Sequence, residues 1–369
     1  MPTLERIIIQ DFRNIELQEI EFSPNVNCIF GGNGEGKTNL LDAIHYLSMT
    51  KSAFGASDRF NFRHGTKSFS LGGVYSMPNG LESRFSIQVG GEAQKIVKRD
   101  DKPYAKISSH IGVLPIVLIS PADISLVSES GEERRRFVNS VLSQMDPTYL
   151  SDVQNYSRLL MQRNMMLKNG SGDETLYETV EAMMGSLSAR IYEKRREFAQ
   201  RLEPVVKSYY SLISGGREDV GIVYESDLSK GPLESLLKAS RERDFYLKYT
   251  SEGVQRDDFI FSIDGHPIRK CGSQGQQKSF VVALKFAQYD LMKSACGVCP
   301  ILLMDDLFDK LDMNRVQNLL KMVSGAEFGQ IFLTDSNKVR LGSIIESISG
   351  DRRFIEARAG KFTQPDGKE

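Results

Sequence analysis

The chain has 369 residues, of which 40% are hydrophobic and 26% charged, and its formal net charge at pH 7 is −1. This is the composition of an ordinary globular protein of two or three domains, and it excludes an overall basic field, so binding to nucleic acid would need a local patch. A membrane-spanning helix needs about 20 apolar residues in a row. Even the longest apolar runs here are short, such as residues 116–119 and 301–304, and we therefore expect a cytoplasmic protein that does not cross a membrane.

The first part of the chain predicts short strands around one helix. Apolar and polar residues alternate over most of these segments, which is the period of a half-buried strand. Two of the intervals, Pro78-Asn79-Gly80 and Gly90-Gly91, are turn sequences that predict antiparallel hairpins. The predicted strands are residues 6–9, 15–22, 26–30, 68–77, 82–89, 93–99 and 116–119, and the predicted helix is residues 38–49.

The middle of the chain is predicted to be mostly helical. Ser130 and Glu133 match a capping box, in which each side chain would bond the other's backbone N–H, so a helix should begin at Ser130. Asp146 followed by Pro147 predicts a second helix start. The remaining predictions are a loop at residues 168–173, a long helix from there to about residue 213 that bends or breaks near Pro204, and a helix at residues 232–247.

After residue 250 helices and strands alternate again. An α/β sheet interrupted by a helical insert is the simplest architecture. We therefore predict one domain formed by residues 1–122 and 251–369, and a helical domain of residues 123–250. The last ten residues, 360–369, should form a frayed tail. The predicted elements are a helix at residues 276–292, a strand at 301–304, a helix at 314–323 and a strand at 330–334.

A glycine-rich turn between the strand at residues 26–30 and the following helix fits the phosphate-loop pattern G-x-x-x-x-G-K-[ST]. Its glycines let backbone N–H groups point inward and the helix N-terminus adds positive potential, so the turn can hold a polyphosphate. Lys37 would reach the β- and γ-phosphates, and the Thr38 hydroxyl would bind Mg²⁺. A simple left-handed glycine turn is the alternative. The loop residues are Gly31, Gly32, Asn33, Gly34, Glu35, Gly36, Lys37 and Thr38.

Two carboxylates follow the buried strand at residues 301–304. In open α/β sheets ligands bind at the carboxyl ends of the strands. Asp305 would hold Mg²⁺, and Asp306 would position and deprotonate the attacking water, which makes Asp306 and Lys37 the candidate catalytic residues. Acidic residues often follow strands without any such role. The pair predicts a metal and catalytic site only because a phosphate loop is also present in the chain.

A third motif, Ser273-Gln274-Gly275-Gln276, opens the helix that precedes this strand. A small polar turn at a helix N-terminus is a second candidate anion site. The alternative is a purely structural role, in which Ser273 is the N-cap of the helix and is followed by a flexible turn.

Phosphate loop, S-x-G-Q turn and D-D strand follow one another in the order of the ABC-type ATPases, and the chain closely resembles the RecF family of SMC-like repair proteins. The resemblance covers nearly the whole chain. It implies an α/β fold of the P-loop NTPase type: an ABC-ATPase head with an antiparallel N-terminal sheet and a mostly helical inserted lobe, without a long coiled coil. The matching segments are residues 12–14, 32–44, 120–137, 162–164, 272–279 and 305–312.

The resemblance also implies that two ATP molecules are sandwiched between two copies of the chain. One copy would supply Lys37 and the phosphate loop, and the other would supply its S-x-G-Q turn to the γ-phosphate. ATP would thereby join an ATP-dependent homodimer, and hydrolysis would release it. The further nucleotide-binding residues carried over are Arg13, Asn39, Ser273, Gly275 and Gln276.

The implied function is ATP-dependent DNA binding in recombinational repair and replication, with a weak DNA-linked ATPase that converts ATP and water to ADP and phosphate. The dimer would bind double-stranded DNA near a single-strand gap or junction and, with RecO and RecR, assist the loading of RecA. The alternative is an ABC-type ATPase subunit of another assembly, such as a transporter or a nuclease-coupled complex.

The chain departs from the family pattern at a few positions. Asp306 stands where most ABC ATPases have glutamate, which is longer by one methylene, so slow hydrolysis is expected. Gln255 stands where the family usually has histidine, and Lys310 where it often has glutamate. The next two residues, Leu311-Asp312, match a loop that would face the partner.

Two basic runs and one pair of thiols have more than one interpretation. In the run 134–136 neighbours on a helix point about 100° apart, so one or two arginines could meet DNA while another pairs with a glutamate. The run 194–196 is interpreted mainly as a solvated helix face of mixed charge.

Cys296 and Cys299 could form half a zinc site or a redox pair, but a turn that holds two thiols is the simpler interpretation.

Overall fold

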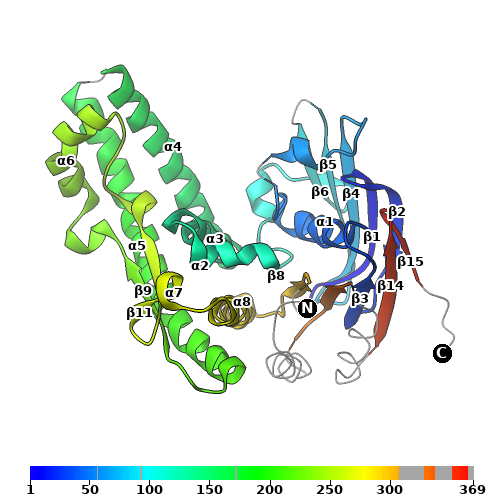
Figure 1. Ribbon diagram of the computed structural model, residues 1–369. Coiled ribbons are helices and arrows are strands. Elements are labelled where there is room, and N and C mark those ends of the chain that lie inside the picture. The colour runs from blue at the N-terminus through cyan, green and yellow to red at the C-terminus, as the bar shows by residue number, and fades with distance from the viewer. Residues whose placement is uncertain (56, 92–93, 171–172, 307–327, 337–350, 365–369) are drawn as a thin grey trace. The chain divides into compact units, whose positions relative to one another are not determined.

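The structure is a computed structural model that describes residues 1–55, 57–91, 94–170, 173–306, 328–336 and 351–364. The chain divides into two compact units, and Figure 1 labels their elements. Unit 1 comprises residues 1–123 and 288–369, and unit 2 comprises residues 124–287. The first boundary lies beside the predicted one. Residues 251–287 pack with unit 2, whereas the sequence assigned them to the α/β domain, and that assignment stays a prediction.

The first sheet of unit 1 is antiparallel, in the order β2-β1-β4-β5-β6-β7. β4 pairs with β5 across the Pro78-Asn79-Gly80 turn, and β5 pairs with β6 across the Gly90-Gly91 segment, so both predicted hairpins are confirmed. The strands are β1 (Thr3–Phe12), β2 (Ile15–Glu21), β4 (Phe69–Ser76), β5 (Glu82–Val89), β6 (Lys95–Arg99) and β7 (Lys102–Pro103).

The second sheet of unit 1 has the order β15-β14-β3-β13-β12-β8 and is parallel except for β15. Every residue of β3, β8, β12 and β13 is buried, as expected for strands covered on both faces. The strands are β3 (Val26–Phe30), β8 (Ile116–Ile119), β12 (Ile301–Met304), β13 (Ile331–Asp335), β14 (Arg352–Arg358) and β15 (Lys361–Thr363).

The prediction of a frayed tail at residues 360–369 is wrong for its first part. Residues 361–363 form a strand rather than part of a frayed tail, because Phe362 pairs with Ala357 of β14 and is buried. One apolar residue between two polar ones is too short a pattern to be recognised in the sequence. Residues 365–369 and the predicted helix at 314–323 lie outside the described residues.

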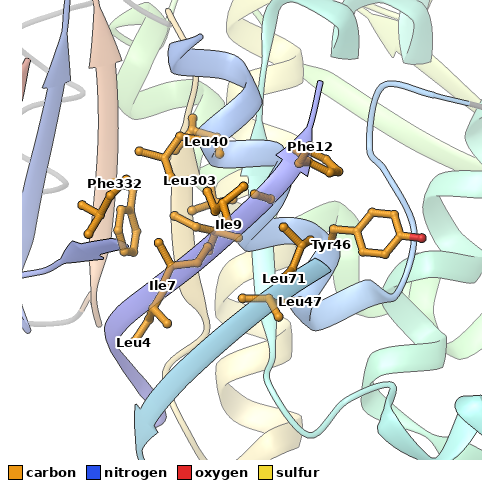
Figure 2. Close-up of a cluster of buried hydrophobic side chains, with 14 of the residues drawn as sticks. Leu4, Ile7, Ile9, Phe12, Leu40, Tyr46, Leu47, Leu71, Leu303 and Phe332 are labelled. Atoms are coloured by element: carbon orange, nitrogen blue, oxygen red, sulfur yellow. The ribbon is translucent and has the colours of Figure 1, made fainter. Parts of the chain in front are cut away.

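A hydrophobic core joins both sheets of unit 1 to the helix α1 (Lys37–Met49). Figure 2 shows Leu40 of α1 near Ile9 of β1 and Leu303 of β12, and Leu47 of α1 near Leu71 of β4, with Phe332 of β13 in the same cluster. Burying a side chain of this size stabilises the fold by about 1.5–3 kcal/mol. The helix that follows the phosphate loop is therefore firmly anchored.

Unit 2 is mostly helical, as predicted, but it also contains a sheet in the order β11-β10-β9 that the sequence did not reveal. Its helices are α2 (Ser125–Ser128), α3 (Gly131–Met145), α4 (Pro147–Asn169), α5 (Glu174–Ser214), α6 (Leu233–Leu247), α7 (Ile268–Cys271) and the first part of α8 (Gln274–Cys296). Its strands are β9 (Val220–Glu225), β10 (Asp258–Ile263) and β11 (His266–Pro267). Short 3-10 helices in the two units are η1 (Asp58–Asn61), η2 (Ile107–His110), η3 (Pro121–Ile124), η4 (Asp227–Lys230) and η5 (Val254–Arg256).

The predicted helix ends of unit 2 are largely confirmed. Asp146 caps α4 by accepting hydrogen bonds from the backbone N–H of Thr148 (2.9 Å) and Tyr149 (3.3 Å). α3 begins after Ser130 as predicted, yet the Ser130 side chain makes no cap hydrogen bond, so the capping-box prediction is wrong in that detail. α5 continues through Pro204 without a break. No helix among the described residues is long and apolar enough to span a membrane.

Candidate nucleotide site

The candidate site lies at the carboxyl edge of the parallel sheet in unit 1. β3 is followed by the phosphate loop, its neighbour β13 ends at Thr334 and Asp335, and the next strand β12 is followed by Asp305 and Asp306. Because these strands are parallel, their ends meet at one edge. The sequence motifs at residues 31–38 and 305–306 are thereby brought together.

The loop needs glycine at two positions. Gly31 has φ +152°, and a Cβ there would lie 2.2 Å from the carbonyl oxygen of Ala357. Gly36 has φ +107°, and a Cβ there would lie 2.9 Å from the Asn14 side chain. Only glycine adopts such positive φ values without strain while allowing so close an approach. The tip of the loop, Gly32 to Gly34, is exposed.

The N-terminus of α1 is open. Its N-cap residue is Gly36, no side chain of the described residues caps it by a hydrogen bond, and its first turn carries no acidic residue. The first N–H groups of a helix have no partner within the helix and carry positive potential. The loop and this helix end together form an anion-binding arrangement.

Lys37 lies buried at the start of α1, and its ammonium group points back into the loop. Nζ donates hydrogen bonds to the carbonyl oxygens of Gly31 (2.7 Å) and Gly32 (2.8 Å). A polyphosphate held in the loop would lie against the same ammonium group. Lys37 thus has the position that phosphate binding requires.

Thr38 and Asp305 contact each other across the sheet edge. The Thr38 hydroxyl lies 2.9 Å and 3.1 Å from the two carboxylate oxygens of Asp305, and the Thr334 hydroxyl donates to the same carboxylate at 2.7 Å. A hydroxyl and a carboxylate at this separation are the oxygen ligands that Mg²⁺ prefers beside a phosphate. These donors fit a magnesium ion.

Asp306 is held by its backbone in an uncommon conformation. Its φ is +45°, and its N–H donates to the Thr334 hydroxyl at 2.9 Å. Non-glycine residues in this left-handed region are uncommon and tend to occur at functional sites. The Thr334 hydroxyl therefore bonds both members of the acidic pair, a contact that the sequence alone did not reveal.

Arg13 is fixed by a set of polar contacts beside the phosphate loop. Its guanidinium group pairs with Asp42 at 2.6 Å and donates to Ser52 at 2.9 Å and to Asn39 at 3.1 Å. Its backbone has φ +53°, and its N–H donates to the Asn61 carbonyl at 2.8 Å. The sequence predicted Arg13 and Asn39 here but missed the other three residues.

Asp42 is the buried acid of this set. Burial raises the pKa of the Asp42 carboxyl, while the Arg13 charge and the Ser52 hydrogen bond act in the opposite direction. A carboxylate without exposed surface has to be paired, and an aspartate among the apolar residues of helix 38–49 was the one sequence signal for such a contact.

Beside Arg13 lies a cavity of about 680 Å³ that the sequence did not predict. Its wall is mainly aromatic and cationic, and Phe60 is 76% exposed. A cavity with these walls suits a flat aromatic ring with polar edges. The lining residues are Arg13, Asn14, Phe54, Gly55, Phe60, Phe62, Arg63 and His64.

The rest of the loop is tied to its surroundings. The Glu35 carbonyl accepts a hydrogen bond from the Gly360 N–H at 2.9 Å, and its carboxylate accepts one from the Ala359 N–H. Asn39 donates to the Asn14 side chain at 2.7 Å. Glu35 thus positions the loop against the turn between β14 and β15.

The S-x-G-Q turn lies in unit 2. Ser273 and Gln276 form a reciprocal cap at the start of α8: the Ser273 Oγ accepts from the Gln276 N–H at 3.3 Å, and the Gln276 Oε1 accepts from the Ser273 N–H at 2.7 Å. The Gln276 amide also donates to Glu218 at 3.0 Å. Ser273 is exposed and Gly275 half-buried. The N-cap interpretation is correct, and the hydroxyl proton of Ser273 remains available to a ligand.

The basic runs of unit 2 mostly bond within the unit. Arg134 makes two hydrogen bonds to the Asp258 carboxylate, at 2.7 Å and 2.9 Å. Burial acts to raise the pKa of Asp258, but the bonds and charge of Arg134, together with the Phe259 N–H and the charge of Arg135, lower the pKa. Arg136 pairs with both Glu132 and Glu133.

The second run behaves in the same way. Arg195 is buried and pairs with Asp257 at 2.5 Å, Lys194 pairs with Asp146, and Arg196 with Glu193. Gln255, the departure from the family histidine, accepts a hydrogen bond from Tyr156 and donates to the Glu252 carbonyl at 2.8 Å. These contacts stabilise unit 2.

None of the four cysteines is in a disulfide bond, and the described residues hold no cluster of three or more potential metal ligands of the histidine, cysteine or carboxylate type. Lys310, Leu311 and Asp312 lie outside the described residues.

Comparison with known proteins gives concordant results. The AAA domain family matches residues 6–203. The DNA replication and repair protein RecF of Porphyromonas gingivalis is 43% identical over 98% of this chain and 100% of its own length. A solved structure of the recombination mediator RecF with ATP, of the RecFOR pathway, has 27% identity and a TM-score of 0.89 over 99% of this chain and 98% of that one. An Smc head domain from Pyrococcus furiosus, solved with an extended coiled coil, shares the fold at a TM-score of 0.58 and 15% identity, over 98% of this chain and 95% of that one.

Proposed function

The chain belongs to the RecF family of DNA replication and repair proteins, and from that premise we propose that it acts as an ATP-gated DNA clamp in recombinational repair. Its ATP-bound homodimer binds duplex DNA near a single-strand gap and, with RecO and RecR, assists the loading of RecA. The observation that carries the proposal is the sheet edge in unit 1, where the buried Lys37 ammonium group and the bonded pair Thr38–Asp305 surround one phosphate loop.

ATP binds with its phosphates in the loop formed by residues 31–38. The open N-terminus of α1 and the Lys37 ammonium group neutralise the β- and γ-phosphates. Thr38 and Asp305 would hold Mg²⁺, which when bound would supply positive charge to neutralise the phosphates. The solved structure of a RecF protein with ATP supports this choice of nucleotide.

The nucleobase enters the cavity of about 680 Å³ beside Arg13. Phe60 and Phe62 offer ring faces, and Arg13 lies between this cavity and the loop, since its guanidinium group bonds Asn39, the residue after Thr38. A base buried against aromatic rings supplies affinity that phosphates alone do not.

Hydrolysis uses Asp306 as the residue that orients and deprotonates water. General-base catalysis contributes about 10²–10⁴-fold in rate. The aspartate side chain is shorter than the glutamate of most related ATPases, so the base reaches less far and turnover is slow. We propose that DNA binding accelerates it.

A second copy completes the site. Ser273, Gly275 and Gln276 of one protomer contact the γ-phosphate held by Lys37 of its partner. The cap geometry supports this role, because Ser273 accepts a backbone N–H and can still donate its own proton. ATP then links the two protomers, and its hydrolysis releases them.

The testing experiment is sedimentation of the wild-type chain and of Asp306→Asn, with and without ATP and duplex DNA. The proposal predicts monomers without nucleotide, and ATP-dependent dimers that the variant retains longest and that DNA stabilises. Monomers under every condition would contradict the clamp.

A second variant tests the coupling between nucleotide and DNA. Lys37→Ala should lose the ATP-dependent retention of DNA, because the phosphate loop no longer holds the nucleotide. Retention that survives this change would show that the two ligands bind independently.

A further inference from the structure

A carboxylate lies inside the phosphate loop, at a position where the loop pattern accepts any residue. The Glu35 side chain makes no ion pair among the described residues, and a negative charge beside a polyphosphate opposes its binding. Instead, the Glu35 carboxylate accepts a hydrogen bond from the N–H of Ala359, 324 residues away in sequence, and the Glu35 carbonyl accepts one from the Gly360 N–H at 2.9 Å. The position therefore serves a contact with another segment of the chain.

That segment is the two-residue turn between β14 and β15, which Arg358 and Lys361 close as a pair. Ala359 and Gly360 have φ values of +48° and +76°, and two positive values in succession are typical of a type I′ hairpin turn. Alanine is uncommon at the first of these positions, where asparagine, aspartate and glycine are preferred. The strained turn aims the N–H groups of both its central residues at Glu35.

The turn is itself fixed in place. Gly360 is buried, and a Cβ there would lie 2.3 Å from the carbonyl oxygen of Asn14. Two residues further on, the Phe362 N–H donates to the Gln18 side chain of β2 at 2.9 Å. On the other side β14 pairs with β3, the strand that leads into the phosphate loop. The turn thus offers the loop a rigid support.

The contacts of Lys37 cannot replace this support once a ligand is bound. Its ammonium group donates to the carbonyl oxygens of Gly31 and Gly32, and a polyphosphate in the loop would compete for the same protons. The bonds between Glu35 and the β14–β15 turn use none of these protons. Backbone N–H groups bind an anion well only when the loop already has the right shape, because ordering the loop costs affinity.

We propose that Glu35 is a positioning residue for the nucleotide. Held by the Ala359-Gly360 turn, it keeps the phosphate loop in the shape that binds the phosphates, and it acts through its oxygen acceptors rather than through its charge. The inference rests on the proposed function, since it takes ATP as the ligand of the loop. It deepens that function by making the β14–β15 turn a part of the nucleotide site.

Isothermal titration calorimetry with ATP and Mg²⁺ tests the acceptor. Glu35→Ala should weaken ATP binding about tenfold, as for a loop that keeps its binding shape about a tenth of the time, although removal of the charge alone would strengthen binding. Glu35→Gln also lacks the charge but keeps an oxygen acceptor, so it should bind ATP several-fold more tightly than Glu35→Ala. Glu356→Ala, which removes an exposed carboxylate of β14, is the matched control and should bind as the wild type does.

A double-mutant cycle tests the turn. Valine at position 359 is strained at a positive φ, so Ala359→Val should move the donor N–H and weaken ATP binding in the wild-type background. In the Glu35→Ala background it should have little further effect, because the contact is already lost. In both single variants KM for ATP should rise while kcat stays within about twofold, since Asp305 and Asp306 follow a different strand. Melting temperatures measured without nucleotide show that the variants are folded.

The outcomes separate this inference from the proposed function. If the wild type binds no ATP, the proposed function fails. If the wild type binds ATP and Glu35→Ala binds it as tightly, the loop does not need Glu35 and the inference alone is wrong. An equal loss in Glu35→Gln and Glu35→Ala would assign the effect to charge, and independent, additive losses in the cycle would show that the turn does not act through Glu35. Either result would overturn the proposal.

Discussion

The two glycine-containing turns of the proposed ATP site begin helices in opposite ways. α1 starts at the phosphate loop without a side-chain cap, and the Lys37 ammonium group bonds carbonyls of the loop itself. α8 starts at the S-x-G-Q turn with a reciprocal cap between Ser273 and Gln276. Both turns look like anion sites in the sequence, but only the first leaves its helix N–H groups without a side-chain cap.

Because of this difference, we expect the phosphate loop to bind the nucleotide and the S-x-G-Q turn to respond to its γ-phosphate. An open helix end with a buried lysine can hold a polyphosphate by itself. At a capped helix end the side chains already bond the backbone N–H groups, so only the hydroxyl proton can still be donated to a ligand. Such an end can contact a phosphate that is bound mainly by another turn. Changes in the first turn should therefore reduce ligand binding, and changes in the second should reduce stability and assembly.

The largest expected effect concerns Asp306, the acidic residue that follows β12 at the same edge of the sheet as the phosphate loop. Asp306→Asn should lower the rate of ATP hydrolysis by about 10²–10⁴-fold, because the amide cannot accept the proton of the attacking water. ATP affinity, measured by equilibrium dialysis, should stay within about twofold, since the phosphate loop is untouched. A variant that hydrolyses ATP at the normal rate would remove Asp306 from the mechanism.

The next effect concerns the phosphate loop. Lys37→Ala should weaken ATP binding about 10- to 150-fold, because it removes charged hydrogen bonds to the phosphates. Isothermal titration calorimetry measures this directly. The comparison predicts that Ser273→Arg leaves the ATP affinity of the monomer unchanged, so a similar loss in that variant would show that the two turns are not separate.

A smaller effect concerns the stability of unit 2, and it tests whether the arginines of this unit stabilise it through ion pairs. Asp258→Asn should lower the free energy of unfolding by about 1.5–3 kcal/mol, since Arg134 loses a charged partner. The pKa of Asp258 is lowered in the folded chain, so its contribution is present above the unfolded value of about 3.9 and is lost as pH falls below it. Urea unfolding at pH 7 and pH 3 should show a smaller pH dependence in the variant, and an equal dependence would contradict the ion pair.

The smallest effect concerns the cap itself. Ser273→Ala should destabilise the chain by about 1 kcal/mol through loss of the N-cap hydrogen bond, while Ser273→Thr, which keeps the hydroxyl, should cost less. Thermal unfolding followed by circular dichroism is sufficient. An unchanged melting temperature would mean that α8 does not depend on this cap.

Sequence reasoning found the parts of the fold that depend on local pattern. The strands at residues 26–30, 116–119 and 301–304 were predicted to the residue, because uninterrupted apolar runs bounded by polar residues have few other interpretations. The antiparallel N-terminal sheet and the inserted helical lobe also agree with the prediction and with the resemblance.

The missed features depend on contacts between distant residues. β9 and β10 are paired across a long interval that contains α6. β9 lies inside the segment that was predicted to be helical, and no strand was predicted at β10, which lies after that segment. Ser130 begins α3 but does not cap it, since a sequence match cannot show where a side chain points. Asp42 was seen as part of a helix, yet its partner Arg13 comes from the turn before β2.

The candidate site shows the same division. The loop residues and the acidic pair follow from short motifs, but the Thr334 hydroxyl that bonds both Asp305 and Asp306 depends on the order of strands in the sheet. The aromatic cavity beside Arg13 likewise combines side chains from the turn before β2 and from the segment after α1. Such assemblies require the tertiary structure.

The most direct test of the composite site is to mix two inactive variants, Lys37→Ala and Ser273→Arg, and to measure ATP hydrolysis with DNA present. Each variant keeps the half that the other lacks, so a mixed dimer would contain one complete site made of the Ser273→Arg protomer's phosphate loop and its partner's intact turn. The account predicts activity in the mixture that neither variant shows alone. A mixture as inactive as its components, or a Ser273→Arg monomer that hydrolyses ATP at the wild-type rate, would contradict it.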